Sequence, residues 1–199
     1  MVNEIGRRVM QGGSRRSAIY ASLNWQHPDI HKFLECKNWY DMPVGDTGFS
    51  IGQIKEQDFN FNAPLDMTNI SVNYDTEWLL KYLRTGDAGE VFEKNVKQAL
   101  STAEPGFSFN FFDKENETLR NACTEVCSDT DSDVCNLGSL NLGRIESVKE
   151  LSDIVELATK FLLCGTLRAK LPYEKVYKVR EKNRRLGLGL MGIHEWLIK

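Results

Sequence analysis

The sequence predicts an α/β fold with parallel strands in its sheet. Short apolar segments typical of strands alternate along the chain with longer segments whose apolar residues recur at helical spacing. The composition is that of a globular protein, with 41% hydrophobic and 27% charged residues among 199. A chain of this length usually forms one domain, or at most two small ones.

The first half of the chain is predicted to hold the end of a helix, a strand, a helix and a second strand. These cover residues 3–10, 18–23, a span that opens at 27–29, and 68–74. Pro28 favours the helix start, because proline lacks the N–H that the first helical turn leaves unpaired. Ile70, Val72 and Tyr74 would share one face of the second strand. Residues 41–62, rich in Gly, Asp and Asn, are predicted to be irregular.

The second half is predicted to hold three helices and another strand. Asp75 or Thr76 would cap the first helix and Gly86 would end it. A helix near 91–100 and an apolar strand at 107–112 follow. Ser147 and Glu150 form the pattern of a capping box. The helix that they open carries an apolar stripe expected to cover a core, made of Leu151, Ile154, Val155, Ala158, Phe161 and Leu162.

Charge and composition exclude several classes of protein. Twenty-five Lys and Arg against 28 Asp and Glu give a net charge of −3, too little for bulk attraction to nucleic acid. The first ten residues, with Glu4, Arg7 and Arg8, do not resemble a signal peptide, and no apolar run approaches the roughly 20 residues of a membrane span. Five cysteines, unevenly spread, do not suggest a secreted disulfide framework. We therefore expect a cytoplasmic protein with reduced thiols.

Three of the five cysteines, Cys123, Cys127 and Cys135, fall within one short segment. Their C-x3-C-x7-C spacing offers three soft metal ligands, but no histidine follows closely to complete a zinc site. Free cysteines are more often small buried hydrophobic residues, which suits Cys36 and Cys164 on helical stripes. A third interpretation concerns reactivity around Cys123.

In an extended segment, Asn121, Cys123 and Glu125 would point the same way and present an amide, a thiol and a carboxylate together.

Residues 187–192 satisfy the G-x-G-x-x-G dinucleotide fingerprint, but the charged residues 181–185 before them do not suit the required buried strand. Close packing of a helix is the expected use of these glycines.

Residues 121–125, Asn-Ala-Cys-Thr-Glu, followed by residues 135–142, Cys-Asn-Leu-Gly-Ser-Leu-Asn-Leu, resemble the active-site loop and next strand of the ribonucleotide reductase catalytic subunit. Four further landmarks agree with that family in the same order. They are residues 12–18, residues 27–30 with Lys37, residues 69–72, and residues 183–192.

The resemblance implies the family's ten-stranded α/β barrel in incomplete form. Residues 1–199 would be one partial catalytic barrel domain, with a specificity loop near 11–18 and an active-site loop near 120–136. We expect the chain to be inactive without complementary flanking segments, as a partial sequence or one piece of a split enzyme.

The resemblance also implies reduction of ribonucleoside di- or triphosphates to 2′-deoxyribonucleotides for DNA precursor synthesis. By motif match, Cys123 would be the thiyl radical that abstracts the 3′ hydrogen, and Glu125 the general base at the 3′-hydroxyl. Asn121 would hold the ribose hydroxyls. Cys135 would be one of two thiols that supply electrons by closing a disulfide, and its partner would precede Met1.

The specificity loop would consist of Gly12, Gly13, Arg15, Arg16, Ser17 and Ala18. In the family it relays bound deoxynucleotide or ATP effectors to the choice of substrate base. Arg15 would face the base, and the glycines would give the loop its freedom. The alternative is a glycine-broken turn with solvated arginines.

The residues around Arg15 and Cys123 resemble the adenosylcobalamin-dependent class more closely, and the alternative radical source is a small metal-containing subunit. A thioredoxin- or glutaredoxin-type reductant and a homo-oligomer are the other expected partners, without nucleic acid or membrane. Two other functions stay open: a non-catalytic nucleotide-sensing module of the same fold, and a cysteine-ligated metal-binding module.

Overall fold

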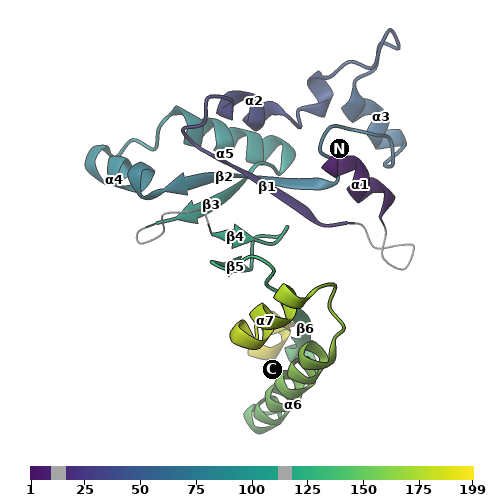
Figure 1. Ribbon diagram of the computed structural model, residues 1–199, viewed down its shortest axis with the longest axis vertical. Coiled ribbons are helices and arrows are strands. Elements are labelled where there is room, and N and C mark those ends of the chain that lie inside the picture. The colour runs from purple at the N-terminus through teal and green to yellow at the C-terminus, as the bar shows by residue number, and fades with distance from the viewer. Residues whose placement is uncertain (10–16, 112–117) are drawn as a thin grey trace. The chain divides into compact units, whose positions relative to one another are not determined.

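The structure is a computed structural model that describes residues 1–9, 17–111 and 118–199 (Figure 1). The chain divides into two compact units, Met1–Cys127 and Ser128–Lys199, which are described one at a time. None of the described helices combines the length and the apolar character that crossing a membrane requires.

A parallel sheet in the order β1-β2-β3 is the centre of the first unit. Its strands are β1 (Ile19–Asn24), β2 (Thr68–Asp75) and β3 (Gly106–Asn110). The prediction of parallel strands in an α/β fold is confirmed. Side chains alternate between the two faces of each strand, so Ile70, Val72 and Tyr74 share one face, as predicted.

Helices α2 (Ile30–Glu35) and α5 (Glu90–Thr102) lie over one face of this sheet (Figure 1). The first unit also contains α1 (Val2–Arg8), η1 (Trp39–Asp41), α3 (Ile51–Gln57) and α4 (Thr76–Thr85). Tyr74 is the centre of an aromatic core, with ring centroids 4.9 Å from Trp78 and 5.3 Å from Phe92. Burial raises the pKa of Tyr74 to about 12.

The ends of α4 confirm the sequence prediction. Asp75 Oδ1 accepts a hydrogen bond from Trp78 N at 3.1 Å, and Gly86 adopts the left-handed conformation (φ 70°) that ends the helix. The prediction that residues 41–62 are irregular was wrong, because α3 lies within them. Ser50 and Gln53 form a complete capping box at its start, a local signal that the high content of Gly, Asp and Asn obscured.

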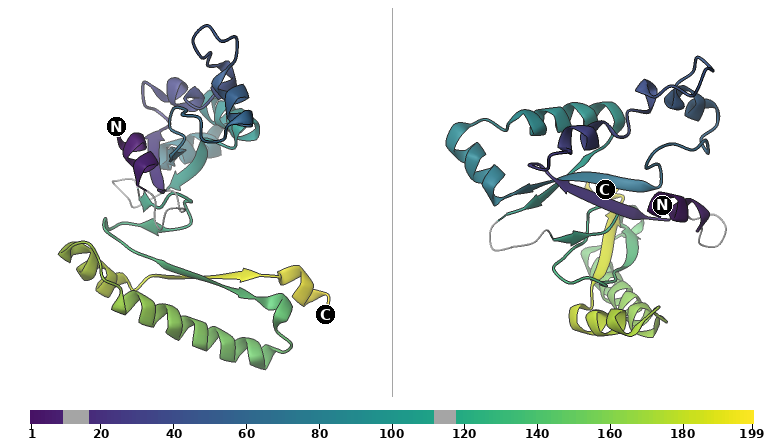
Figure 2. Two further views of the ribbon diagram at one scale, coloured as in Figure 1. Left: turned by 90° about the vertical axis from the view of Figure 1, so that its right-hand side faces the viewer. Right: turned by 45° about the horizontal axis from the view of Figure 1, so that its top comes forward.

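The second unit contains a parallel strand pair, β6 (Asn136–Asn141) and β7 (Leu186–Met191). The chain between them forms η2 (Leu142–Arg144), α6 (Val148–Arg168) and α7 (Glu174–Asn183), and α8 (Ile193–Leu197) follows β7. Figure 2 shows the long α6 alongside the two strands. Ser147 Oγ caps α6 by accepting from Glu150 N at 3.1 Å, whereas the Glu150 carboxylate accepts from Glu146 N, so the expected capping box is only half formed.

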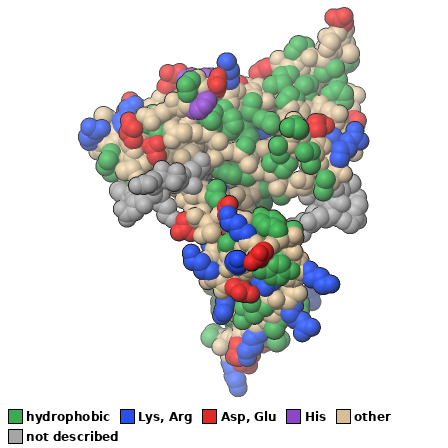
Figure 3. Space-filling model, viewed as in Figure 1, with side chains coloured by type: hydrophobic (Ala, Val, Ile, Leu, Met, Phe, Trp, Pro, Cys, Tyr) green, Lys and Arg blue, Asp and Glu red, His purple; other side chains and the backbone are tan. Residues whose placement is uncertain are grey.

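Three expectations about the second unit were wrong. Gly187 and Gly189 lie inside β7, where a Cβ would meet Leu137 and Ser139 of β6, so they allow close strand contact and not helix packing. Cys164 is exposed. Phe161 is 76% exposed although Leu162 is buried, because the stripe is wider than the strand pair that α6 covers. Apolar side chains reach the surface of both units (Figure 3).

Candidate active site around Cys123

The loop that carries Cys123 is a turn between two short paired strands. β4 (Leu119–Arg120) precedes it, and β5 (Cys127–Ser128) follows it. Thr124 has a positive φ of 64°, and its N–H donates to Asn121 O at 3.0 Å. The expectation of an extended segment was therefore wrong. The reason is that Asn121 Oδ1 accepts from Val126 N at 3.1 Å, a local side-chain bond that competes with extended structure.

The turn nevertheless brings two of the three expected site residues together. Asn121 Nδ2 donates to Glu125 Oε1 at 2.6 Å, so the amide holds the carboxylate directly. Cys123, between them in sequence, is exposed and forms no disulfide. The turn thus carries an accessible thiol and, two residues further along the chain, an oriented carboxylate, which are groups suited to chemistry on a bound ligand.

Cys123 lines a small hollow of about 170 Å³ within the first unit. The starts of β2 and β3 supply the opposite wall. Its lining residues are Asn69, Ile70, Ser71, Ala103, Glu104, Gly106, Ala122, Cys123 and Thr124. Sequence reasoning singled out Asn69 to Ser71 only as a landmark and missed Glu104 altogether.

Glu104 is fixed by contacts to both of its oxygens. Oε2 forms an ion pair with Lys37 Nζ, and Oε1 accepts from Ile70 N at 3.3 Å. Lys37 Nζ also donates to Thr68 O at 2.6 Å. The Lys37–Glu104 pair therefore links the segment that follows α2 and the segment that precedes β3 to the start of β2, the central strand.

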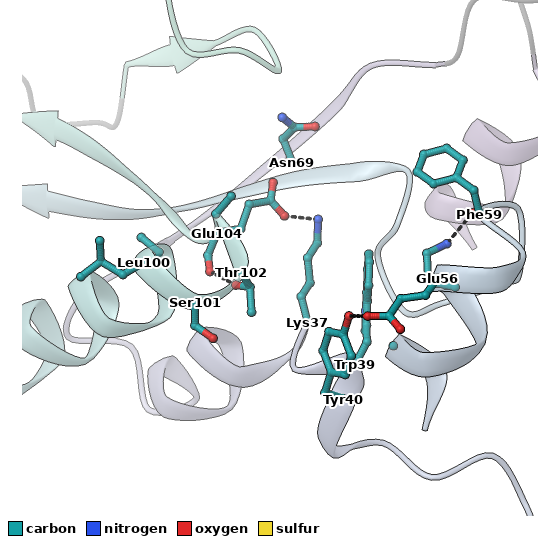
Figure 4. Close-up of a pocket in the computed structure, with 14 residues that line it drawn as sticks. Lys37, Trp39, Tyr40, Glu56, Phe59, Asn69, Leu100, Ser101, Thr102 and Glu104 are labelled. Atoms are coloured by element: carbon teal, nitrogen blue, oxygen red, sulfur yellow. Dashed lines mark hydrogen bonds and ion pairs between the residues drawn. The ribbon is translucent and has the colours of Figure 1, made fainter. Parts of the chain in front are cut away.

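The same carboxylate borders a larger cavity of about 840 Å³, shown in Figure 4. Asn69, Ala103 and Glu104 line both spaces. Elsewhere in its lining, the Tyr40 hydroxyl donates to Glu56 Oε1 at 2.6 Å, and Lys55 Nζ donates to Phe59 O at 2.9 Å. The polar groups drawn in this cavity are thus largely paired with one another.

Arg120 attaches the Cys123 loop to the sheet. One of its terminal nitrogens donates to Cys127 Sγ at 2.7 Å, and the other donates to Phe109 O at 2.9 Å. Asn110 Oδ1 accepts from Thr118 N at 2.9 Å and adds a second attachment. Cys127, which matched no family position in the sequence, therefore has a structural contact with the strand before the loop.

Cys135 lies just before β6 in the second unit, half-buried and in no disulfide. Asp133, two residues earlier, accepts hydrogen bonds at 2.9 Å from Ser128 Oγ, Asn183 Nδ2 and Arg185 Nε. Burial by itself would raise the pKa of Asp133, but these donors together hold that pKa below its usual value. Residues 183–185, a landmark in the sequence, thus anchor the segment before Cys135.

The proposed specificity loop falls mostly outside the described residues. Gly12, Gly13, Arg15 and Arg16 lie there, whereas Ser17 is half-buried and Ala18 is exposed just before β1. Within the part of the chain that the structure describes, no group of three or more His, Cys, Asp or Glu side chains converges as a metal site would require.

Comparison with known proteins identifies the family. Residues 55–199 match the family described as ribonucleotide reductase, barrel domain. A vitamin B12-dependent ribonucleoside-diphosphate reductase of Thermoplasma acidophilum is 30% identical over 96% of this chain and 26% of its own length. The corresponding protein of Mycobacterium tuberculosis (strain CDC 1551 / Oshkosh) is 27% identical over 95% of this chain and 28% of its own length.

A ribonucleoside-diphosphate reductase subunit alpha of Chlamydia trachomatis is 25% identical over 100% of this chain and 23% of its own length. The chain therefore spans about a quarter of the length of these relatives. The ordered motifs, the parallel α/β architecture and the family match agree with one another. The chain belongs to the ribonucleotide reductase family, and its fold is an incomplete form of that family's barrel domain.

Proposed function

We propose that this chain is the central part of a catalytic subunit that reduces ribonucleotides to 2′-deoxyribonucleotides with a thiyl radical on Cys123. The observation that carries the proposal is the 2.6 Å bond from Asn121 to Glu125 in the same turn as an exposed Cys123 thiol that lines a hollow. A nucleotide-sensing module needs no thiol at such a place.

Cys123, Glu125 and Asn121 have separate roles in the proposed reaction. The Cys123 sulfur radical takes the hydrogen from C3′ of the ribose, because S–H and such C–H bonds are close in strength. Glu125 accepts the proton of the 3′-hydroxyl and later returns it, and the 2′-hydroxyl leaves as water after it takes a proton from one of the two reducing thiols. Asn121, which orients Glu125, also holds the ribose hydroxyls in place. The hydrogen finally returns from Cys123 to C3′, which restores the sulfur radical.

The substrate must also receive two electrons and two hydrogen equivalents, which a pair of thiols supplies by forming one disulfide bond. Cys135 is one member of this pair in the proposal. The other lies outside this sequence, and a thioredoxin- or glutaredoxin-type protein reduces the disulfide after each turnover. The bonds of Asp133 to Asn183 and Arg185 fix the segment that leads to Cys135.

Adenosylcobalamin is the radical source that we propose, because two of the relatives are vitamin B12-dependent reductases and because of the motif around Cys123. A small metal-containing subunit is the alternative, because another relative is named subunit alpha. The 170 Å³ hollow is smaller than the roughly 300–1,000 Å³ of pockets for drug-sized ligands and cannot hold a corrin ring. We therefore assign none of the described residues to a cobalamin site.

Regulation and assembly belong to the same proposal. Residues 11–18 would relay deoxynucleotide or ATP effectors to the substrate base, with Arg15 against it. The isolated chain would be inactive, because exposed apolar side chains such as Phe161 and Leu157 need covering segments. The assembled enzyme would be a cytoplasmic homo-oligomer.

The test is turnover by the enzyme assembled from this chain and the remaining segments of a full-length catalytic subunit. We expect Cys123→Ser to abolish deoxynucleotide formation while nucleotide binding persists. Cys135→Ser should stop multiple turnover in the presence of a thioredoxin-type reductant. Cys164→Ser, an exposed cysteine on α6, is the matched control and should keep full activity. Turnover by Cys123→Ser would overturn the proposal.

A further inference from the structure

The β1-β2-β3 sheet has one polar face, which is unusual for parallel strands because both of their faces are normally apolar. Strand alternation places on this face every second residue of the three strands. They are Tyr20, Ser22 and Asn24 on β1, Asn69, Ser71, Asn73 and Asp75 on β2, and Gly106, Ser108 and Asn110 on β3. The opposite face carries the apolar core around Tyr74.

At the carboxyl end of the strands, the polar side chains satisfy one another. Asn24 Nδ2 donates to Asp75 Oδ2 at 2.9 Å. Asn110 Nδ2 bonds to Asn73 Oδ1 and donates to Ser108 Oγ at 3.2 Å. This end is a closed hydrogen-bond network and has no need of a ligand.

At the amino end of the strands, next to Cys123, the corresponding groups are unpaired. Ser71 is only 2% exposed and lines the hollow, and no hydrogen bond of its hydroxyl occurs among the described residues. The neighbouring Tyr20 hydroxyl is buried and also lacks a partner among these residues. The buried Tyr20 hydroxyl carries a desolvation cost that no bond offsets, whereas the Ser71 hydroxyl, in the wall of the hollow, is available to a ligand bound there.

The hollow opens onto this unpaired end. Asn69 and Ser71 line it from β2, and Cys123 lines it from the loop. Gly106 keeps the space open, because a Cβ there would lie 2.9 Å from Ser71 Oγ. The volume of about 170 Å³ equals roughly six waters at about 30 Å³ each, the scale of one sugar ring and not of a whole nucleotide.

The charges of the lining define the ligand's chemistry. None of the described residues that line the hollow is a cation, so nothing there would hold a phosphate. The one carboxylate, Glu104, is already engaged by Lys37 and Ile70 N. The neutral amide of Asn69 and the neutral hydroxyls of Ser71 and Thr124 remain beside the Cys123 thiol, and these amide and hydroxyl groups both donate and accept, as sugar hydroxyls do.

We propose that Asn69 and Ser71 bind the hydroxyls of the substrate ribose and hold the sugar against Cys123. This inference rests on the proposed function and adds two binding residues on β2 to it. It separates the sugar, in the hollow, from the phosphates, which must be held by other residues.

The experiment compares a ribonucleoside diphosphate with its 2′,3′-dideoxy analogue in the assembled enzyme, at a fixed effector concentration. Asn69→Ala and Ser71→Ala should each raise KM for the ribonucleotide about 2- to 12-fold, the range for one neutral hydrogen bond. Neither should change the inhibition constant of the dideoxy analogue. Ser22→Ala, on the same polar face but not in the lining, is the control for Ser71, and exposed Asn62→Ala is the control for Asn69.

A second readout needs no turnover. Iodoacetamide labelling of Cys123, followed by mass spectrometry, reports occupancy of the hollow. The ribonucleotide should protect wild-type Cys123 better than the dideoxy analogue does, and Ser71→Ala should remove that difference. If KM and the protection of Cys123 are both unchanged in the Asn69 and Ser71 variants, the inference is overturned. Turnover by the same enzymes would still support the proposed function. Ribose-dependent protection without any turnover would instead refute the proposed function alone.

Discussion

Asn121 and Glu125 meet across a turn, with Asn121 Nδ2 2.6 Å from Glu125 Oε1 and the left-handed Thr124 between them. The same Asn121 side chain accepts from Val126 N, so one amide both shapes the loop and aims its carboxylate. This double use makes Asn121 the most sensitive non-reacting position of the loop.

Replacing Asn121 by alanine should lower kcat/KM of the assembled enzyme by about 10- to 100-fold. The physical reason is the loss of a hydrogen bond to a charged carboxylate, worth about 1.5–3 kcal/mol. Steady-state kinetics with the ribonucleotide substrate measures the effect. Asn62→Ala should leave kcat/KM within twofold of wild type, and an equally active Asn121→Ala enzyme would contradict the assignment.

The Lys37–Glu104 pair should contribute to the stability of the first unit. Its side chains are only 11% and 21% exposed, so Lys37→Met leaves a half-buried carboxylate without its cation and should cost about 1–3 kcal/mol. Urea unfolding measures this free energy.

The matched control is Lys94→Met, which breaks the more exposed Lys94–Glu35 pair and should cost less than about 1 kcal/mol. Adding Glu104→Gln to Lys37→Met should recover part of the loss, because no unpaired charge then remains. Equal losses for the two lysine variants would contradict a special role for Lys37.

Asp133 should make the second unit sensitive to acid. Because its folded-state pKa lies below the unfolded value, its stabilising contribution is present above the unfolded pKa near 4 and is lost as pH falls through the folded pKa. Hydrogen exchange of the segment around residues 128–135 between pH 6 and pH 3 should show protection falling in wild type. Asp133→Asn should be less protected at pH 6 and should change less on acidification; the same pH dependence in both proteins would refute this.

Arg180 should stabilise the carboxyl end of α6. It is 5% exposed, and its terminal nitrogen donates to Thr166 O at 2.8 Å and Ala169 O at 3.2 Å, carbonyls that the helix itself leaves free. Arg180→Met should therefore cost about 1–3 kcal/mol and increase hydrogen exchange in the last turn of α6. The control is Lys178→Met, which changes an exposed residue on α7, the helix that carries Arg180. Fraying of the last turn of α6 in the Lys178 variant alone would contradict the proposed cap.

Ser71→Ala should not destabilise the protein, although Ser71 is almost fully buried. Removing a hydroxyl that has no hydrogen-bond partner among the described residues breaks no bond, so thermal unfolding should be unchanged or shifted upward. A clear drop in Tm would show that the hydroxyl has a structural partner and would weaken the ribose-binding inference.

Local sequence patterns were enough to predict the structure wherever a residue acts through its near neighbours in the chain. Asp75 capping Trp78, the Gly86 end of α4 and the alternation along β2 are all of this kind, and so is the identity of the motif around Cys123. The capping box at Ser50 was equally local but was hidden by the composition around it.

Local sequence patterns could not predict contacts between residues that are far apart in the chain. Lys37 and Glu104 are 67 positions apart, and the polar face exists only because the register places Ser22, Ser71 and Gly106 side by side. The sequence by itself determined the family, the parallel α/β class and the residue types at the candidate site. Only the tertiary structure decided that the loop turns, what surrounds Cys123 and which polar groups stay unpaired, because these depend on how separate strands and helices pack and not on the order of neighbouring residues.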